Sequence, residues 1–216
     1  MDLSPIKQPV LAGDVEATVA AVRETMAAGA DPAAIVSEAL IPAMEEVGEL
    51  FASGEYFVPE LLMSARAMMA AVEHLRPALT RGGYESSGTV VIGTVQGDMH
   101  DIGKRLVSMM LEGNGFTVVD LGTDVSSERF IEAARDEGAA VVALSALLST
   151  TLPAMEATVK ALRQAGLGNA VRIIVGGAPV TDAFAHRIGA DGYAADAPGA
   201  ATLARRLTGP MTQSSE

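Results

Sequence analysis

Apolar positions in the first third of the chain recur at helical spacing. Between residue 13 and about residue 81 they fall three or four positions apart, the period that places side chains on one face of an α-helix. The first such face comprises Val15, Val19, Val22 and Met26. A second helix is expected to start at Asp31-Pro32, with the aspartate as N-cap and the proline in the first turn. Its apolar positions are Ile35, Leu40, Met44, Val47 and Phe51.

A third helix is expected to open at Pro59, after the chain is broken by Ser53-Gly54-Glu55. An earlier apolar segment at residues 5–12 completes a four-helix bundle. The connections between these helices are short, which favours antiparallel neighbours. The first part of the chain is therefore predicted to be a helical bundle.

The pattern changes after residue 88. Short, continuous apolar runs rich in β-branched residues occur at 89–95, 117–119, 140–144, 171–175 and 192–194. Helical stretches separate or follow them, at 102–113, 126–137, 152–165, 180–188 and 197–207. Strands that alternate with helices predict βαβ units and a parallel sheet covered on both faces. The expected fold class is α/β, with the helical bundle followed by a flavodoxin-like or Rossmann-like doubly wound sheet of five parallel strands.

The composition also marks the domain boundaries. Residues 82–88, Gly-Gly-Tyr-Glu-Ser-Ser-Gly, have the small and polar character of a linker. We therefore expect a helical-bundle cap domain at 1–82, a linker at 83–88, an α/β domain at 89–209 and a disordered tail at 210–216. The linker is the expected hinge between the two domains.

The charge of the chain excludes several partners. The 216 residues include 15 Lys+Arg and 27 Asp+Glu, a formal net charge of −12. Such a chain repels phosphate backbones and anionic lipids, so we expect neither nucleic acid nor a membrane as a partner. The chain lacks the ~18 consecutive apolar residues of a membrane span, and its N-terminal residues lack the features of a signal peptide. A cytoplasmic location is expected.

Ligands of open α/β sheets bind beyond the carboxyl ends of the strands, so the loops after the first, third and fourth strands are the candidates. The first loop, Gln96–Lys104, is not a phosphate-binding P-loop, because Asp98 stands where glycine is required and Arg105 where a hydroxyl is required. It also lacks the Gly-x-Gly-x-x-Gly of dinucleotide sites. A phospho-receiver would need a lysine after the fifth strand, where Ala194 and Ala195 stand instead.

What remains in this loop is Asp98-x-His100-x-x-Gly103. Neutral imidazole is a good ligand for a transition metal, and a carboxylate that accepts its other N–H fixes the tautomer. The chain has no Cys, and its two further histidines, His74 and His186, come from distant regions of the sequence. Because one histidine cannot hold an ordinary metal ion, the metal is expected to arrive with its own equatorial ligands, as in a macrocycle. Gly103 would allow a bulky ligand to approach the backbone closely.

Three loops taken together resemble the signature of cobalamin-binding domains. The motifs are Asp98-x-His100-x-x-Gly103, Ser145-x-Leu147 and Gly176-Gly177. The family includes the corrinoid module of methionine synthase and the corrinoid proteins of methylamine and methanol methyltransferase systems. The bundle, with Gly-Glu-Tyr-Phe-Val-Pro-Glu-Leu at 54–61, is similar to the helical cap domain of those proteins. The resemblance covers nearly the whole chain and implies cobalamin, as methylcobalamin or another corrinoid, as the cofactor.

The resemblance also implies roles for individual residues. His100 would be the lower axial ligand of cobalt, and therefore the metal ligand. Asp98 would bond the far nitrogen of His100, and Thr151 stands where a serine completes this relay in methionine synthase. Phe57 and Leu61 would cover the upper face of the cobalt. The cofactor-binding residues implied in all are Asp98, Met99, His100, Asp101, Ile102, Gly103, Ser145, Leu147, Ser149, Thr151, Gly176, Gly177, Ala178, Phe57 and Leu61.

Each of these residues also has an interpretation without a cofactor. His100 can be a loop histidine that bonds a neighbouring carboxylate. The hydroxyl residues after the third strand can cap the following helix, and the glycine pair can be a turn. Phe57 and Leu61 can be core residues of the bundle.

The function that the resemblance implies is that of a methyl carrier in a corrinoid-dependent methyltransferase system, rather than a free-standing catalyst. A substrate-specific methyltransferase would load the methyl group onto the bound cobalamin, and a second methyltransferase would pass it to a thiol or tetrahydrofolate. A reductive activating protein would rescue oxidised cobalt. The alternatives are a cobalamin-dependent sensor or regulatory module and the cobalamin subunit of a mutase. The absence of Trp and of a spare basic helix-turn-helix argues against the first, and the helical cap argues against the second.

Overall fold

The computed structural model describes residues 3–81, 86–167 and 170–209. The chain divides into two compact units. One contains the residues up to Ser86 together with Glu112–Gly115, and the other contains Ser87–Leu111 and the chain from Phe116 onward. Residues 82–85, which include the start of the predicted linker, and the predicted tail at 210–216 lie outside the described residues. In the described part of the chain, no helix is both long enough and apolar enough to cross a bilayer.

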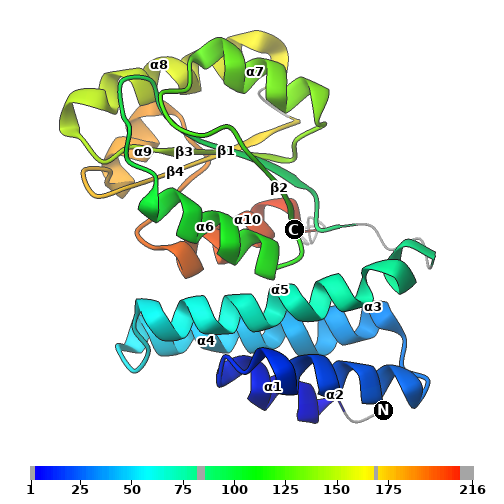
Figure 1. Ribbon diagram of the computed structural model, residues 1–216. Coiled ribbons are helices and arrows are strands. Elements are labelled where there is room, and N and C mark those ends of the chain that lie inside the picture. The colour runs from blue at the N-terminus through cyan, green and yellow to red at the C-terminus, as the bar shows by residue number, and fades with distance from the viewer. Residues whose placement is uncertain (1–2, 82–85, 168–169, 210–216) are drawn as a thin grey trace, which may run out of the picture. The chain divides into compact units, whose positions relative to one another are not determined.

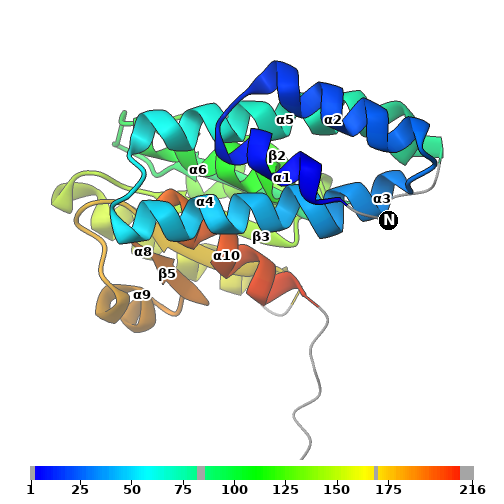
Figure 2. The ribbon, with the colours of Figure 1, turned by 90° about the horizontal axis from the view of Figure 1, so that it is seen from below.

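The first unit is the predicted helical bundle. Its elements are α1 (Ser4–Leu11), α2 (Val15–Ala27), α3 (Pro32–Ile35), η1 (Val36–Leu40), α4 (Ile41–Ser53) and α5 (Val58–Arg81). Asp14 and Asp31 cap α2 and α3, because their carboxylates accept hydrogen bonds from backbone N–H groups of the first turn. α1 packs against α2 and α4, and α5 packs against the same two helices (Figure 2).

The second helical run of the bundle contains a feature that its apolar spacing did not predict. Between α3 and α4 the backbone forms a π-helical turn, in which the N–H of Ile41 donates to the carbonyl of Val36, five residues back. The next residue is Pro42, which has no N–H to donate to the preceding turn. A proline at this position explains why the regular α-helical bonding is interrupted here.

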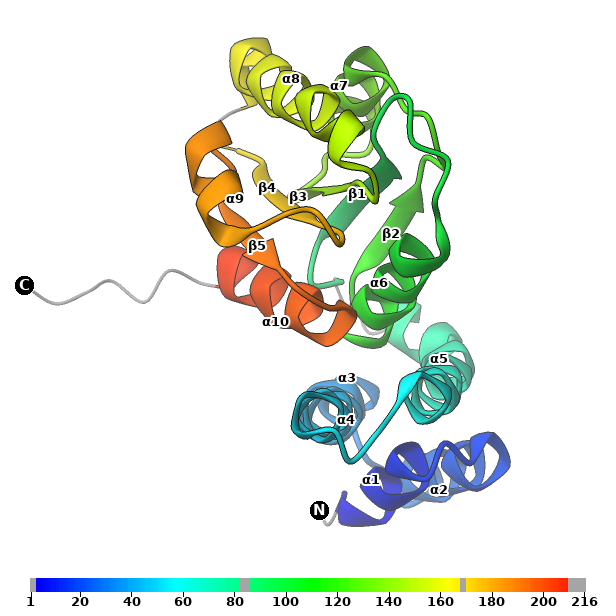
Figure 3. The same cartoon turned by 90° about the vertical axis from the view of Figure 1, so that its left-hand side faces the viewer.

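The second unit is a doubly wound α/β fold, which confirms the predicted fold class. Its strands are β1 (Thr89–Thr94), β2 (Thr117–Asp120), β3 (Val141–Ser145), β4 (Arg172–Gly176) and β5 (Gly192–Ala194). All are parallel, in the order β2-β1-β3-β4-β5. Its helices are α6 (Ile102–Gly113), α7 (Ser127–Asp136), α8 (Leu152–Leu162), α9 (Asp182–Ile188) and α10 (Ala197–Thr208). α7, α8 and α9 cover one face of the sheet and α6 and α10 cover the other (Figures 1 and 3).

Helices on both faces bury the centre of the sheet. The strands β1 and β3 accordingly consist almost entirely of buried residues, as expected for central strands of a sheet with two covered faces. Two helix boundaries of this unit differ from the prediction by two or more residues. The helix expected at 152–165 ends at Leu162 and continues as a π turn, η3 (Arg163–Leu167), with Gly166 in the left-handed region at φ +79°. The helix expected from residue 180 begins at Asp182, because the Thr181 hydroxyl accepts the N–H of Phe184 and caps it.

The strand register brings four small residues into one row at the carboxyl edge of the sheet. Thr94 lies opposite Ser145, Ser145 opposite Gly176, and Gly176 opposite Ala194. The loops that follow these residues therefore emerge from the same edge. In a doubly wound sheet this is the edge where ligands bind.

Candidate functional site

The centre of the site is the carboxylate of Asp98, which is fully buried in the loop after β1. Its Oδ1 accepts from Nδ1 of His100 at 2.7 Å and from the backbone N–H of His100 at 3.1 Å. Its Oδ2 accepts from the N–H groups of Leu147 and Leu148, at 2.7 and 3.1 Å. The hydroxyl of Thr151 lies 2.9 Å from the same Oδ2. The loops after β1 and β3 thus meet at one buried carboxylate.

These contacts decide the charge of Asp98. Burial opposes ionisation and raises the pKa of the carboxyl. The hydrogen bonds from the His100 ring, the Leu147 N–H, the His100 N–H and the Thr151 hydroxyl act in the opposite direction and outweigh burial, so the pKa lies well below its usual range. Asp98 is therefore an anion at neutral pH and acts only as an acceptor.

The anionic carboxylate sets the tautomer of His100. Because Oδ1 of Asp98 can only accept, Nδ1 of His100 carries the hydrogen and a neutral ring leaves its lone pair on Nε2. In the described part of the chain no hydrogen bond engages Nε2, and 49% of the His100 side chain is exposed. The hydroxyl of buried Thr94 donates to the His100 carbonyl at 2.8 Å and holds the backbone below the ring. His100 is thus an oriented, half-exposed imidazole whose Nε2 is available to a ligand or metal.

Exposed apolar side chains belong to the same loops as His100 and Asp98. Met99 is 69% exposed and Ile102 is 87% exposed, and both belong to the same loop and helix start as His100. Leu147 and Leu148, whose N–H groups bond Asp98, are also exposed. Exposed apolar groups gathered near a polar centre are typical of a binding surface. This apolar rim suits contact with the face of a large ring.

The glycines of the three loops differ in whether the fold itself requires a residue without a Cβ. Gly177 has φ +119°, and a Cβ there would lie 1.9 Å from the carbonyl oxygen of Ala146, so the loop packing itself requires glycine. A Cβ on Gly176 would lie 3.0 Å from the carbonyl oxygen of Ala194. Gly103 is different: it does not adopt a left-handed conformation, and a Cβ there would meet no atom within 4 Å. The fold does not require glycine at 103, which fits a position that a bulky ligand approaches.

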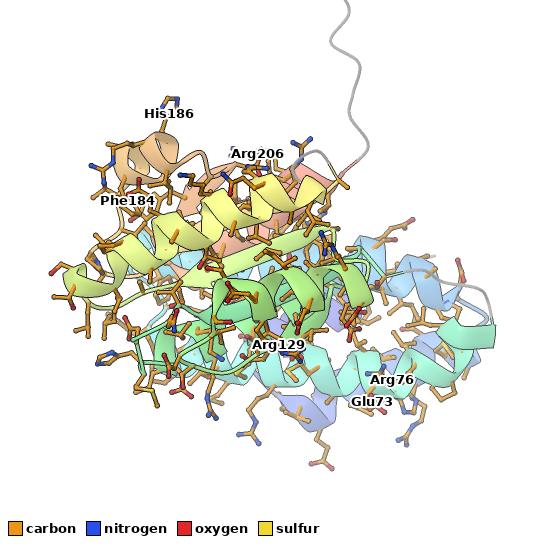
Figure 4. All side chains as sticks on the ribbon, turned by 90° about the horizontal axis from the view of Figure 1, so that it is seen from above. Glu73, Arg76, Arg129, Phe184, His186 and Arg206 are labelled. Carbon is orange, nitrogen blue, oxygen red and sulfur yellow. The ribbon has the colours of Figure 1, made fainter. Side chains whose placement is uncertain are left out.

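A bare metal ion does not fit this chain. Among the described residues, no three His, Asp or Glu side chains converge on one point. His186 projects from α9 (Figure 4), and His74 is exposed on α5 of the helical unit. The donor set at the site is a single outward imidazole, held by an anion and surrounded by apolar groups. Such a set fits a metal that is already bound in a macrocycle, and His100 would be its protein ligand.

The other predicted site residues divide into two groups. Ser145, Ser149 and Ala178 lie at the carboxyl edge of the sheet or in the loops that leave it, and the carboxylate of Asp101 pairs with Arg105 at 2.6 Å. Phe57 and Leu61 belong to the helical unit, whereas this cluster belongs to the α/β unit.

Within that unit the two residues differ. Phe57 is 65% exposed, whereas Leu61 is fully buried and is not part of an accessible surface. The carboxylate of Glu60 accepts the Phe57 N–H at 3.0 Å, a half capping box that fixes the start of α5.

The alternative interpretation of Thr151 as a simple helix cap does not describe its contacts. Thr151 occupies the N-cap position of α8, but its side chain makes no capping bond to the helix. Its hydroxyl oxygen instead lies 2.9 Å from Oδ2 of Asp98 and 2.8 Å from the carbonyl oxygen of Leu148. One hydroxyl hydrogen serves these two acceptors.

The sequence argument missed the loop after β2. Asp124 of that loop accepts the N–H of Gly97 and donates its own N–H to the carbonyl of Asp98. Asp120, at the end of β2, pairs with the buried ammonium of Lys104 in α6. The end of β2 lies at the same edge of the sheet as the ends of β1, β3 and β4, so its loop was also a candidate for the site. The sequence did not single it out, because only the strand order shows that β2 is next to β1.

Comparisons with known proteins identify the family of both parts of the chain. Residues 88–202 match one family model described as B12 binding domain, and residues 3–76 match a second with the same description. The chain is 44% identical to dimethylamine corrinoid protein 1 of Methanosarcina acetivorans over 178 residues, 82% of this chain and 84% of the relative.

Two solved structures are similar over most of the chain. A cobalamin-binding protein of Desulfitobacterium hafniense superimposes with a TM-score of 0.83 at 35% identity, covering 95% of this chain and 98% of the other. A chain of the methanol:cobalamin methyltransferase complex MtaBC of Methanosarcina barkeri superimposes with a TM-score of 0.81 at 30% identity, covering 95% of this chain and 79% of the other.

Proposed function

This chain belongs to the family of B12-binding corrinoid proteins, and from this premise we propose that it carries a methyl group on cobalamin bound through His100. The observation that carries the proposal is the pairing of His100 with Asp98. A buried anion holds Nδ1 of the ring and directs Nε2 outward into an apolar rim. A free-standing enzyme would need further catalytic side chains around this point, whereas a carrier needs one oriented ligand.

Bound cobalamin supplies a cobalt centre that can accept a methyl group and release it, and this chemistry belongs to the cofactor. The protein contributes the lower ligand through Nε2 of His100. Asp98 raises the basicity of that nitrogen through its bond to Nδ1–H, and Thr151 supports Asp98 from the opposite oxygen. His100, Asp98 and Thr151 together form the proposed ligand relay.

Asp98 would keep the His100 ring in one orientation whether or not a metal is bound, because its five donors fix the carboxylate in the loop.

The row of small residues at the sheet edge is proposed to receive the nucleotide tail that His100 displaces. Ser145 and Gly176 lie side by side in the register of β3 and β4, and neither carries a side chain larger than a hydroxymethyl group. Gly103 adds open space at the start of α6. Ser149, Gly177 and Ala178 continue the proposed lining into the loops.

The sequence predicted two residues, Phe57 and Leu61, as the cover of the opposite face of the cofactor, and only one of them is proposed here. Phe57 is exposed on the helical unit and remains the proposed cover for the methyl-loaded protein. Leu61 is fully buried, so we leave it out of this role.

The proposed partners are a substrate-specific methyltransferase that loads the methyl group and a second methyltransferase that removes it to a thiol or tetrahydrofolate. The names of two relatives support the first partner, because one is a dimethylamine corrinoid protein and the other belongs to a methanol:cobalamin methyltransferase complex. We also propose a reductive activating protein, since a carrier that cycles through reduced cobalt needs repair after oxidation. The proposed compartment is the cytoplasm, which cell fractionation tests.

A transfer assay tests the function. The protein is loaded with hydroxocobalamin, reduced, and mixed with purified dimethylamine, trimethylamine or methanol methyltransferases and their substrates. The expected result is substrate-dependent methylation of the bound cofactor. The change in the visible absorption spectrum of the cofactor measures it. The matched control is the His100→Ala protein, which lacks the proposed cobalt ligand and should be methylated less than the wild type. Stable adenosylcobalamin on the purified protein, with no methylation by any partner, would contradict the carrier function and favour a mutase subunit or sensor.

A further inference from the structure

The loop after β2 contacts the backbone that carries Asp98 and His100. The carboxylate oxygen Oδ1 of Asp124 accepts the N–H of Gly97 at 2.7 Å. The N–H of the same Asp124 donates to the carbonyl oxygen of Asp98 at 3.0 Å. Asp124 therefore binds the Gly97–Asp98 segment at two points, one through its side chain and one through its backbone.

Asp124 adopts an unusual backbone conformation to make these bonds. Its φ is +54°, and within the described ranges it is the one non-glycine residue with a positive φ. Aspartate tolerates the left-handed region better than most residues, but the conformation still has a cost. Non-glycine residues in such conformations tend to occur at functional sites.

The segment that Asp124 binds needs an external support. Gly97 has φ +84°, and glycine leaves the chain many conformations at this position. The next residue is Asp98, whose position sets that of the His100 ring. Farther along, the buried Lys104 pairs with Asp120, and Asp120 also accepts the N–H of Gly122 at 2.9 Å. The loop after β2 thus holds the His100 segment at both ends.

We propose that Asp124 is a positioning residue for His100: its carboxylate, bonded to the Gly97 N–H, fixes the loop segment whose imidazole would hold the cofactor. Outer partners of this kind orient a metal ligand, and their loss typically lowers metal affinity 10- to 100-fold. The inference rests on His100 as the cobalt ligand. It assigns to the β2 loop a part in cofactor binding that the three recognised motifs do not include.

Three variants separate the parts of this role. Asp124→Gly removes the carboxylate but accepts a positive φ without strain. Asp124→Asn keeps a side-chain oxygen that can accept the Gly97 N–H, and Asn also tolerates the left-handed region. The matched control is Asp14→Gly, which deletes a similar bond, from Ala17 N to Asp14 Oδ1 at 2.9 Å, in the helical unit.

The probe is methylcobalamin, added to each cofactor-free protein. Two quantities are measured: the dissociation constant, and the fraction of bound cofactor whose visible spectrum shows an axial nitrogen ligand. We expect Asp124→Gly to weaken binding about tenfold and to shift the bound cofactor toward the base-off spectrum. Asp124→Asn should restore both quantities, and Asp14→Gly should leave both unchanged.

Two outcomes overturn the proposal. One is an Asp124→Gly protein that binds methylcobalamin with wild-type affinity and spectrum. The other is an Asp124→Asn protein as impaired as Asp124→Gly, which would assign the effect to charge rather than to the hydrogen bond.

If Asp124→Gly does not fold, amide exchange of the cofactor-free wild-type protein gives an independent answer. The Gly97 N–H should exchange slowly in both the wild type and Asp124→Asn, because each side chain offers an oxygen that accepts it, and rapid exchange in the wild type counts against the proposal. Failure of the proposed cofactor ligand would look different, since His100→Ala would then also bind methylcobalamin with an unchanged spectrum.

Discussion

The hydroxyl of Thr151 lies 2.9 Å from Oδ2 of Asp98, on the opposite side of the carboxylate from His100. The two contacts come from loops that follow different strands, yet they use one buried anion. This arrangement links the outward-facing imidazole to the interior of the α/β unit. Replacing any of the three side chains should therefore change the affinity or the visible spectrum of the bound cofactor.

Replacing His100 with Ala removes the proposed cobalt ligand. Bound methylcobalamin should then show a base-off spectrum, because no nitrogen from the protein is available below the cobalt. The exposed histidines provide matched controls: His74→Ala and His186→Ala should keep the wild-type spectrum. A wild-type spectrum in the His100→Ala protein would remove His100 as the ligand.

Replacing Asp98 with Asn removes the buried negative charge but nearly preserves the shape of the side chain. The amide cannot accept at both ends, so one group of donors, such as the N–H of Leu147, is left without its acceptor. We expect a loss of about 1–3 kcal/mol in the free energy of unfolding of the cofactor-free protein. Methylcobalamin affinity should fall about tenfold, because the ring of His100 loses its charged partner.

Urea unfolding and cofactor titration measure these two effects of Asp98→Asn separately. A variant with wild-type affinity would exclude Asp98 from the relay, whatever its stability.

Thr151 tests the third member of the relay. Thr151→Val keeps the volume and removes the hydroxyl, which should lower the free energy of unfolding by about 1 kcal/mol and weaken the axial ligand slightly. Thr151→Ser keeps the hydroxyl and should bind methylcobalamin like the wild type. Titration followed by visible spectroscopy compares the two variants. Equal ligand spectra for Val and Ser would confine Thr151 to a packing role.

Gly177 tests the requirement for glycine in the loop after β4. A Cβ at Gly177 would lie 1.9 Å from the Ala146 carbonyl oxygen, whereas a Cβ at Gly189, which also has a positive φ, would meet nothing within 4 Å. Gly189→Ala should therefore cost only the left-handed backbone penalty, about 1–2 kcal/mol. Gly177→Ala should cost more, because the loop must also move. Urea unfolding of both proteins measures the difference, and equal costs would show that the backbone at 177 relaxes freely.

The lowered pKa of Asp98 predicts an acid dependence of stability. The folded-state pKa lies below the unfolded value of about 3.9, so the ionised carboxylate stabilises the fold fully above that value. This contribution is lost progressively as pH falls below it toward the folded-state pKa. The stability gap between wild type and Asp98→Asn should therefore be constant at neutral pH and shrink below about pH 4. Denaturant unfolding at several pH values measures the gap, and a gap that does not shrink in acid would count against an ionised Asp98.

Local sequence was sufficient for most of the secondary structure. Apolar spacing predicted the bundle helices and the strands, and capping residues such as Asp14 and Asp31 stand where α2 and α3 begin. Where the prediction was wrong by a few residues, the cause was also local. The Thr181 cap delayed α9, and Gly166 changed the end of the helix that follows β3. Such signals act within a few residues, so they can be read without the fold.

The pairing of Asp98 with His100 was predictable for the same reason, since the two residues are separated by one position and their side chains can reach each other. The sequence by itself also indicated that the loop histidine, in a chain without Cys, would need a metal that brings its own ligands. Only the tertiary structure decided what surrounds that pair. Leu147 and Thr151 bond Asp98 from about fifty positions away, and Asp124 from twenty-six, because β3 and β2 flank β1 in the sheet. Strand order depends on which buried faces pack together across the whole unit, and no local pattern specifies it.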